Sequence, residues 1–214
     1  MSLFCRAPVP GATKTRLTPP LTPEQAAALS LALLLDAADA LRGAGHPVEA
    51  RVADAAHTGI LRGLLGELAV LAQGEGDLGA RMERASREAL GPGRAAVAIV
   101  GSDCPAIAPR HLEGAFLALA EGADAAICPS ADGGYGLIAL SRPCPALFER
   151  IPWSTDGVLG ATRRAAQASG LRLAVLEPLD DVDRPQDLDG LAERLERVGA
   201  APRTRHLLYR LGYA

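Results

Sequence analysis

Short apolar runs alternate along the chain with longer segments in which apolar residues recur every three or four positions. The short runs predict strands at residues 3–5, 48–53, 68–71, 95–100, 123–128, 136–140 and 171–176. The periodic segments predict helices at residues 22–42, 60–65, 77–90, 109–119, 154–168 and 185–198. Strands that alternate with helices indicate an α/β protein with a mainly parallel sheet covered by helices on both faces.

The start of the first long helix is marked by its sequence. Thr22 can cap the helix, Pro23 suits the first helical position, and Gln25 completes a capping box. Gly43 and Gly45 follow the last periodic residues and should end the helix.

The length of 214 residues fits one sizeable domain, and neither a linker nor an internal repeat is visible. We therefore expect a single domain at residues 1–199 and a tail at residues 200–214. The tail mixes arginines with leucines and tyrosines, so it can dock on the domain or on a second subunit. Docking on a second subunit would make a homodimer, and a loosely packed terminus is the alternative.

Composition excludes several classes of function. The net charge of −3 and the 3% of aromatic residues argue against a nucleic-acid-binding protein. No apolar run reaches the length of a membrane span, and no signal peptide is evident. The four cysteines lack CxxC spacing, which favours buried free thiols and a cytoplasmic protein.

The lysine at position 14 is the first candidate for chemistry, because every other basic residue among the 22 lysines and arginines is an arginine. Lys14 and Arg16 follow Gly11 in a loop after the first strand, where α/β sheets bind ligands. This combination suits a polyphosphate, with Lys14 acting as a point charge. The loop is not a Walker A loop, because Thr13 stands where glycine should precede the lysine. A solvated basic turn is the alternative.

A second glycine-rich loop reads GxGxxG from Gly74 to Gly79 and precedes a predicted helix. The pattern is typical of dinucleotide binding, but that fingerprint usually belongs to the first β/α unit of a domain, and here two units precede it. Gln73 suggests another use for this loop, because an amide can read a nucleobase edge with one donor and one acceptor.

Acidic residues follow two predicted strands. Asp103 comes after the most apolar strand, and Asp181 and Asp183 come after the last strand. Carboxylates at strand ends are natural ligands for Mg²⁺ or Mn²⁺, and we expect Asp103 to share a metal ion with Asp183 or Asp181. The alternative is that Asp103 caps the next turn and Asp183 caps the helix that Pro185 begins.

The turn from Asp132 to Gly136 lies between two predicted strands. Its glycines allow close approach of a ligand, and Asp132 and Tyr135 can bind an acceptor substrate. A plain hairpin turn is the alternative, since DG is a strong hairpin signal. Trp153, next to Ser154 and Thr155, is the only tryptophan and favours core packing over ligand stacking.

Six motifs together resemble a bacterial family of glycosyltransferase-A-like transferases that is similar to phospholactate guanylyltransferase and, more distantly, to molybdenum-cofactor guanylyltransferase. The motifs are APVPG with KTRL at 7–17, DLGARM at 77–82, GSDCP at 101–105, DGGY at 132–135, WSTD at 153–156 and DVDRP at 181–185. The match covers residues 3 to about 197. Arg6 departs from the pattern, because relatives commonly have lysine there.

The resemblance implies a nucleotide-diphospho-sugar transferase fold, which is a Rossmann-like, mixed and mostly parallel sheet with helices on both faces. It implies metal ligation by Asp103 and Asp183 and catalytic roles for Lys14, Arg16 and Asp103. The residues expected to bind the nucleotide are Ala7, Pro8, Gly11, Lys14, Arg16, Gln73, Leu78, Gly79, Ser102 and Asp103. The residues expected to bind the acceptor are Asp132, Gly133, Gly134, Tyr135, Trp153, Ser154 and Thr155.

Two reactions are compatible with this fold. A metal-dependent nucleotidyltransferase would move NMP from an NTP to a small phosphorylated or hydroxyl acceptor and release pyrophosphate. A glycosyltransferase would instead use a nucleotide-sugar. The basic Gly11–Arg16 loop favours the first reaction, because a triphosphate carries more charge in its transition state. A non-catalytic nucleotide-binding module is a further alternative. The base and the acceptor stay open.

Overall fold

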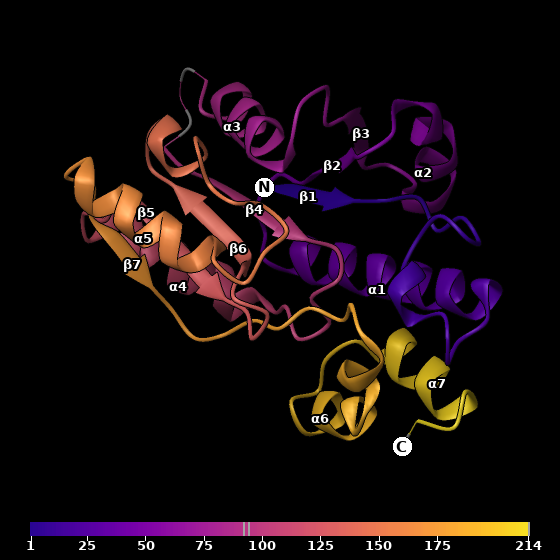
Figure 1. Cartoon of the computed structure of the whole chain (residues 1–214). Coiled ribbons are helices and arrows are strands. Elements are labelled where there is room, and N and C mark those ends of the chain that lie inside the picture. The colour runs from indigo at the N-terminus through magenta and orange to yellow at the C-terminus, as the bar shows by residue number, and fades with distance from the viewer. Residues whose placement is uncertain (92, 94, 214) are drawn as a thin grey trace.

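The computed structural model describes residues 1–91, 93 and 95–213. Residues 92 and 94 of the predicted domain and residue 214 of the predicted tail lie outside this description. The described residues form a seven-stranded sheet in the order β3-β2-β1-β4-β6-β5-β7 (Figure 1). The strands are β1 Ser2–Cys5, β2 Glu49–Val52, β3 Ala69–Ala72, β4 Val97–Gly101, β5 Ala125–Pro129, β6 Tyr135–Leu140 and β7 Leu173–Val175. Only the pairs that β6 makes with β4 and β5 are antiparallel within this sheet, which confirms the mixed, mostly parallel fold.

Helices cover both faces of the sheet. They are α1 Pro23–Gly43, α2 Thr58–Leu65, α3 Leu78–Ala89, α4 Pro109–Ala120, α5 Val158–Ala168, α6 Leu191–Arg197 and α7 Pro202–Arg210. Short 3₁₀ helices are η1 Thr15–Leu17, η2 Ala55–His57, η3 Pro145–Leu147 and η4 Pro185–Leu188. Side chains of α1, α2 and α4 share one apolar cluster with the sheet, and those of α3 and α5 share the other. No helix within the described ranges combines the length and the apolar character needed to span a membrane.

Helix α1 begins as its sequence predicts. The Gln25 amide N–H donates to the Thr22 hydroxyl at 3.2 Å, and the Thr22 N–H donates to the Gln25 side chain at 2.8 Å. These two bonds form the predicted capping box, and Pro23 occupies the first turn. The helix ends at Gly43, and Gly45 takes a φ of 74° that ends the turn.

Two predicted helices have different bounds in the structure. The helix expected from residue 154 begins at Val158, because Ser154 takes a left-handed φ of 65° that a helix cannot include. The closing helix expected at 185–198 is divided into η4 and α6, because Gly190 between them has a φ of 59°. Both breaks come from left-handed residues that periodicity does not reveal.

The segment beyond residue 199 docks on the body of the protein. Helix α7 packs against α1 and α6 through a separate apolar cluster that contains Leu29, Leu33 and Leu208 (Figure 1). Asp36 of α1 is buried and accepts hydrogen bonds at 2.8 Å from both the amide and the hydroxyl of Thr204. A carboxylate of α1 therefore caps the N-terminus of α7. Of the alternatives for the tail, the structure shows docking on the domain.

The sheet order determines where a ligand can bind. Strand β1 lies between β2 and β4. Strands β2 and β3 are added on one side of β1, and the chain then crosses to the other side to form β4. In open α/β sheets the ligand site lies outside the carboxyl ends of the strands at such a switch point. The loop after β1 and the loop after β4 are therefore neighbours at this edge.

Candidate active site

Lys14 is the centre of a charged cluster at the β1/β4 edge. Its ammonium nitrogen lies 3.0 Å from Asp103 Oδ2 and 3.9 Å from Asp183 Oδ1. The Lys14 side chain is 9% exposed, whereas the side chains of Asp103 and Asp183 are 38% and 34% exposed. The structure therefore brings together the predicted phosphate-binding lysine and both predicted metal ligands, which are far apart in the sequence.

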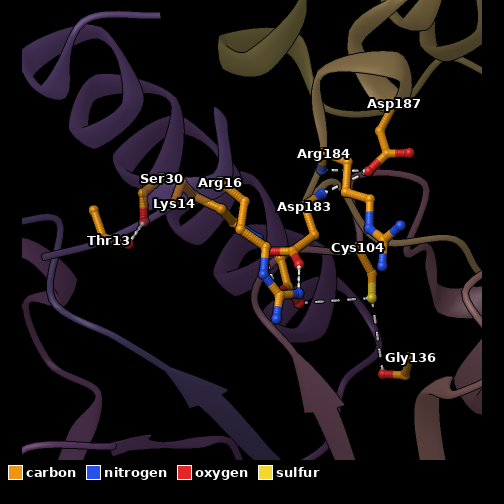
Figure 2. Close-up of polar contacts among 10 residues, drawn as sticks. Thr13, Lys14, Arg16, Ser30, Cys104, Gly136, Asp183, Arg184 and Asp187 are labelled. Atoms are coloured by element: carbon orange, nitrogen blue, oxygen red, sulfur yellow. Dashed lines mark hydrogen bonds and ion pairs between the residues drawn. The ribbon is translucent and has the colours of Figure 1, made fainter. Parts of the chain in front are cut away.

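Arg16 completes the basic side of the cluster. Its guanidinium donates to Asp183 Oδ2 at 2.6 Å, as Figure 2 shows. The Arg16 side chain is 62% exposed and thus remains open to an incoming anion. Lys14 and Arg16 together present positive charge on the same surface as the carboxylates.

Backbone contacts hold the two acidic segments side by side. The Val182 N–H donates to the Asp103 carbonyl oxygen at 3.0 Å, and the Ser102 N–H donates to the Phe4 carbonyl oxygen at 2.9 Å. A Cβ at Gly136 would lie 2.6 Å from Cys104 Sγ and 2.8 Å from the Leu179 carbonyl oxygen. The segments after β4 and β7 therefore come together at Gly136 of β6, where a side chain would not fit.

Asp187, and not Asp183, performs the capping at the end of this segment. Its carboxylate accepts the N–H of Asp183 at 2.8 Å and the N–H of Arg184 at 2.6 Å (Figure 2). Because Asp187 caps η4, the carboxylate of Asp183 is available to Lys14 and Arg16. The capping alternative for Asp183 is therefore wrong.

The loop that carries Lys14 is shaped by a buried hydroxyl pair. Thr13 Oγ1 lies 3.0 Å from Ser30 Oγ of α1, and both side chains are buried. Lys14 itself takes a left-handed φ of 48°, which is uncommon for a residue with a side chain. Thr13 thus anchors the turn that directs Lys14 to the acidic edge. In the sequence Thr13 stands out only as a departure from a Walker A loop, because a threonine gives no sequence signal of such an anchor.

Charge coupling at this edge is strong. Burial opposes the ammonium of Lys14, but Asp103 and then Asp183 and Asp181 raise its pKa above the ordinary value. Burial also opposes the carboxylate of Asp103, yet Lys14 holds the pKa of Asp103 below its ordinary value. Burial and the negative charges of Asp103 and Asp132 raise the pKa of Asp181 to about 7. Lys14 and Asp103 therefore form a charged pair at neutral pH, while Asp181 is left with excess negative charge around it.

The second glycine-rich loop lies away from the switch point, after the edge strand β3. The amide nitrogen of Gln73 donates to the Arg51 carbonyl oxygen at 2.9 Å, and Gln73 is buried. This nitrogen is already bound to the framework, so the contact of Gln73 with a base stays a prediction. A Cβ at Gly79 would lie 2.6 Å from the Phe148 carbonyl oxygen, so Gly79 allows close packing at that point.

The other residues expected to bind nucleotide lie in two places, the loop after β1 and the start of α3. Ala7 is buried and Pro8 is half-buried in the loop after β1, while Gly11 is exposed with a φ of 75°. Leu78 is 42% exposed at the start of α3. Their contacts with a nucleotide stay predictions.

The two segments expected to bind the acceptor touch each other. The Leu159 N–H of α5 donates to the Gly133 carbonyl oxygen at 2.8 Å, and a Cβ at Gly133 would clash with the Asp156 backbone. The turn joins antiparallel β5 and β6, as a hairpin turn does. Asp132 accepts the Gly134 N–H at 2.9 Å, which closes the turn on itself.

The aromatic residues of these segments are packing residues in this structure. Tyr135 and Trp153 meet edge to face, with ring centroids 6.3 Å apart, against the apolar cluster on the α3 side. The Tyr135 hydroxyl is buried, and burial raises the pKa of Tyr135. The contact of Tyr135 with an acceptor stays a prediction. Ser154 and Thr155 are exposed, and the Thr155 hydroxyl donates to the Pro152 carbonyl oxygen at 2.7 Å.

A family model described as "Uncharacterized protein conserved in bacteria (DUF2064)" matches residues 28–155. The chain belongs to this family. It is also 34% identical over 206 residues to phosphoenolpyruvate guanylyltransferase of Rubrobacter xylanophilus, with 93% of this chain and 96% of the relative covered.

Solved structures agree with this assignment. A Desulfovibrio desulfuricans G20 protein assigned to the nucleotide-diphospho-sugar transferases superposes with a TM-score of 0.87 at 28% identity, covering 98% of this chain and 93% of that chain. A cytidylyltransferase from Leptospira borgpetersenii has a TM-score of 0.60 at 12% identity, covering 99% and 93%, and shows the fold alone. The predicted nucleotide-diphospho-sugar transferase fold is confirmed, and the protein is a transferase.

The donor chemistry of the site fits a divalent cation. Asp103 and Asp183 offer carboxylate oxygens, which Mg²⁺ and Mn²⁺ prefer, and each acid is partly exposed. Within the described residues, however, no group of three or more His, Cys, Asp or Glu side chains is arranged to hold a metal. A metal ion at this edge would therefore need ligands from a bound substrate, as Mg²⁺ commonly takes from phosphates.

Proposed function

We propose that this protein is a nucleotidyltransferase that moves NMP from an NTP to a small phosphorylated or hydroxyl acceptor. The observation that carries the proposal is the pairing of Lys14 with Asp103 and Asp183 at the β1/β4 switch point. Open sheets bind ligands at this position, and a lysine there suits a phosphate.

The reaction needs no covalent nucleophile from the protein. An oxygen of the acceptor attacks the α-phosphorus of the NTP, the bond from that phosphorus to the bridging oxygen breaks, and pyrophosphate leaves with the electron pair. Lys14 and Arg16 bind phosphate oxygens and neutralise the charge that develops on them. The loop anchored by Thr13 holds Lys14 in place for this role.

Asp103 and Asp183 are the residues that would hold Mg²⁺ or Mn²⁺. The ion would supply charge neutralisation and orientation of the phosphate oxygens when bound. The acceptor would lie toward the Asp132–Gly136 turn, which lies near enough to Asp181 for Asp132 to influence its charge. The guanylyltransferase relative supports GTP as the first nucleotide to test and phosphoenolpyruvate as the first acceptor.

Labelled nucleotides test the proposal directly. The protein is incubated with Mg²⁺, phosphoenolpyruvate and GTP labelled at either the α- or the γ-phosphate, and the other NTPs and phosphorylated acceptors follow. We expect the α-label in the acceptor product and the γ-label in pyrophosphate. Nucleotidyl transfer would be contradicted if neither label left GTP with any acceptor, or if the α- and γ-labels were both found in the same product.

Glycosyl transfer is the second candidate, and the Desulfovibrio desulfuricans structure favours it. Incubation with nucleotide-sugars distinguishes the two, because sugar transfer releases free NDP and no pyrophosphate. In either reaction Asp103→Asn should lower turnover by about 10²- to 10³-fold, the usual effect of removing a charge-stabilising group. Glu193→Gln on the exposed surface of α6 is the matched control and should leave turnover unchanged. Unchanged activity of Asp103→Asn would contradict the metal assignment.

A further inference from the structure

Lys14 lies beside both carboxylates that would bind a metal ion. Its ammonium nitrogen lies 3.0 Å from Asp103 Oδ2 and 3.9 Å from Asp183 Oδ1, and Arg16 donates to the other oxygen of Asp183 at 2.6 Å. Each predicted metal ligand thus already has a cationic side chain of the protein as its partner. A divalent ion bound to these carboxylates would lie beside the ammonium of Lys14, and the two positive charges would repel each other.

The surroundings of Lys14 keep it at this position. Its side chain is only 9% exposed, and the buried Thr13–Ser30 pair anchors the residue before it. Charge-assisted hydrogen bonds of this kind are roughly twice as strong as neutral ones. The free protein therefore pairs Asp103 and Asp183 with its own cations without any metal.

We propose that Lys14 is a built-in competitor of the divalent metal, which binds Asp103 and Asp183 only together with the nucleotide. The phosphates offer Lys14 and Arg16 new anionic partners, so the lysine leaves the carboxylates as the phosphates arrive. The inference rests on the proposed nucleotide substrate.

The proposal links the binding of nucleotide to the binding of metal. A ligand that favours one arrangement of a protein shifts the population toward it, and the coupling of two ligands is reciprocal. If nucleotide removes Lys14 from the acids, nucleotide raises metal affinity and metal raises nucleotide affinity by the same factor. Direct contact between the metal and the phosphates also couples the two ligands, so the part of the coupling that is lost when Lys14 is replaced measures the competition.

The test is the affinity of the full-length protein for Mn²⁺ without nucleotide, measured from the electron paramagnetic resonance signal of free Mn²⁺. We expect Lys14→Met, which keeps the length of the stem and removes the charge, to bind Mn²⁺ about tenfold more tightly than the wild type, within the usual range of coupling between sites. Lys14→Arg keeps a cation at the acids and should stay close to the wild-type affinity.

Arg6→Ala is the matched control for a long-range effect of charge, because Arg6 influences Asp103 only through its charge. Its affinity for Mn²⁺ should rise much less than that of Lys14→Met. Equal increases in the two variants, or no increase in Lys14→Met, would overturn the competition. Lys14→Gln repeats the test if circular dichroism shows that Lys14→Met is unfolded.

A second arm measures reciprocity by equilibrium dialysis of α,β-methylene-GTP with and without Mn²⁺. Mn²⁺ should raise the affinity of the wild type for this analogue, and the gain should be smaller in Lys14→Met. An equal gain in both proteins would overturn the proposal. Neither arm needs turnover, so a failed transfer assay with tighter Mn²⁺ binding by Lys14→Met would refute the proposed reaction and leave the competition in place.

Discussion

Thr13 and Ser30 hold the candidate phosphate-binding loop onto α1. Their hydroxyl oxygens lie 3.0 Å apart, and both side chains are buried. The next residue, Lys14, has a left-handed φ of 48°, a conformation that persists where surrounding structure enforces it. The buried bond is that enforcement, so we regard Thr13 as a positioning residue that acts through Lys14.

Replacing Thr13 by valine removes this bond while keeping the shape of the side chain. Ser30 then loses its buried partner, so we expect a loss of about 1–2 kcal/mol in the free energy of unfolding. We also expect kcat/KM for nucleotidyl transfer to fall about tenfold, since a misplaced catalytic group slows the reaction. Urea unfolding and steady-state kinetics measure the two effects, and Thr13→Ser should restore most of both.

The same substitution in a Lys14→Met background separates positioning from general instability. If Thr13 acts through Lys14, Thr13→Val should cause no further loss of kcat/KM there. An equal loss in both backgrounds would show that Thr13 supports the whole fold and not the lysine.

Lys14→Arg tests whether a compact ammonium is required. The substitution keeps the charge, but the planar guanidinium is larger and less suited to a buried point contact with phosphate. We expect kcat to fall at least about tenfold, roughly 1.4 kcal/mol of transition-state stabilisation. Arg16→Lys is the matched exchange at an exposed position and should have a smaller effect. Near-normal turnover of Lys14→Arg would argue against the point-charge role.

Asp36 and Asp39 form a matched pair for testing how α7 is held. Asp36 is buried and accepts two bonds from Thr204, whereas the Asp39 side chain is 49% exposed and pairs with Arg42 and Arg203 on the surface. Asp36→Ala leaves the buried Thr204 groups unpaired, so we expect a loss of about 3 kcal/mol in the free energy of unfolding. Asp39→Ala should cost less than about 1 kcal/mol. Urea unfolding compares the variants, and similar losses would contradict a specific cap by Asp36.

The lowered pKa of His111 predicts that the protein loses stability as the pH falls. Burial and then the charge of Arg110 lower its pKa, while Glu177 partly opposes them. The Ala108 N–H donates to His111 Nδ1 at 3.0 Å, a bond that needs the ring nitrogen unprotonated. As pH falls below the ordinary histidine pKa of about 6.5, the unfolded chain takes up a proton before the folded protein does, so stability decreases.

Urea unfolding between pH 7.5 and 5 measures this effect. His111→Asn keeps an acceptor near Ala108 but does not titrate, so its stability should fall less with decreasing pH than that of the wild type. Equal slopes for the two proteins would show that His111 does not contribute to the pH dependence.

Local signals in the sequence predicted much of the framework. The capping box of Thr22 and Gln25 forms as expected, because its partners are three residues apart and need no distant contact. The apolar runs become strands for the same reason. The helix start at Ser154 was wrong and the closing helix from Pro185 is not continuous, because left-handed residues at 154 and 190 interrupt otherwise helical patterns.

The candidate site divides in the same way. The charged side chains and the strand ends that they follow can be identified from the sequence, because strand ends and glycine loops are local features. The folded chain is needed to show that Lys14 pairs with both Asp103 and Asp183, that the Asp187 carboxylate accepts the Asp183 N–H and that Thr13 anchors the loop. These relationships join residues brought together by sheet order and by the Val182 contact, and the hydrophobic periodicity of a single chain does not encode such distances.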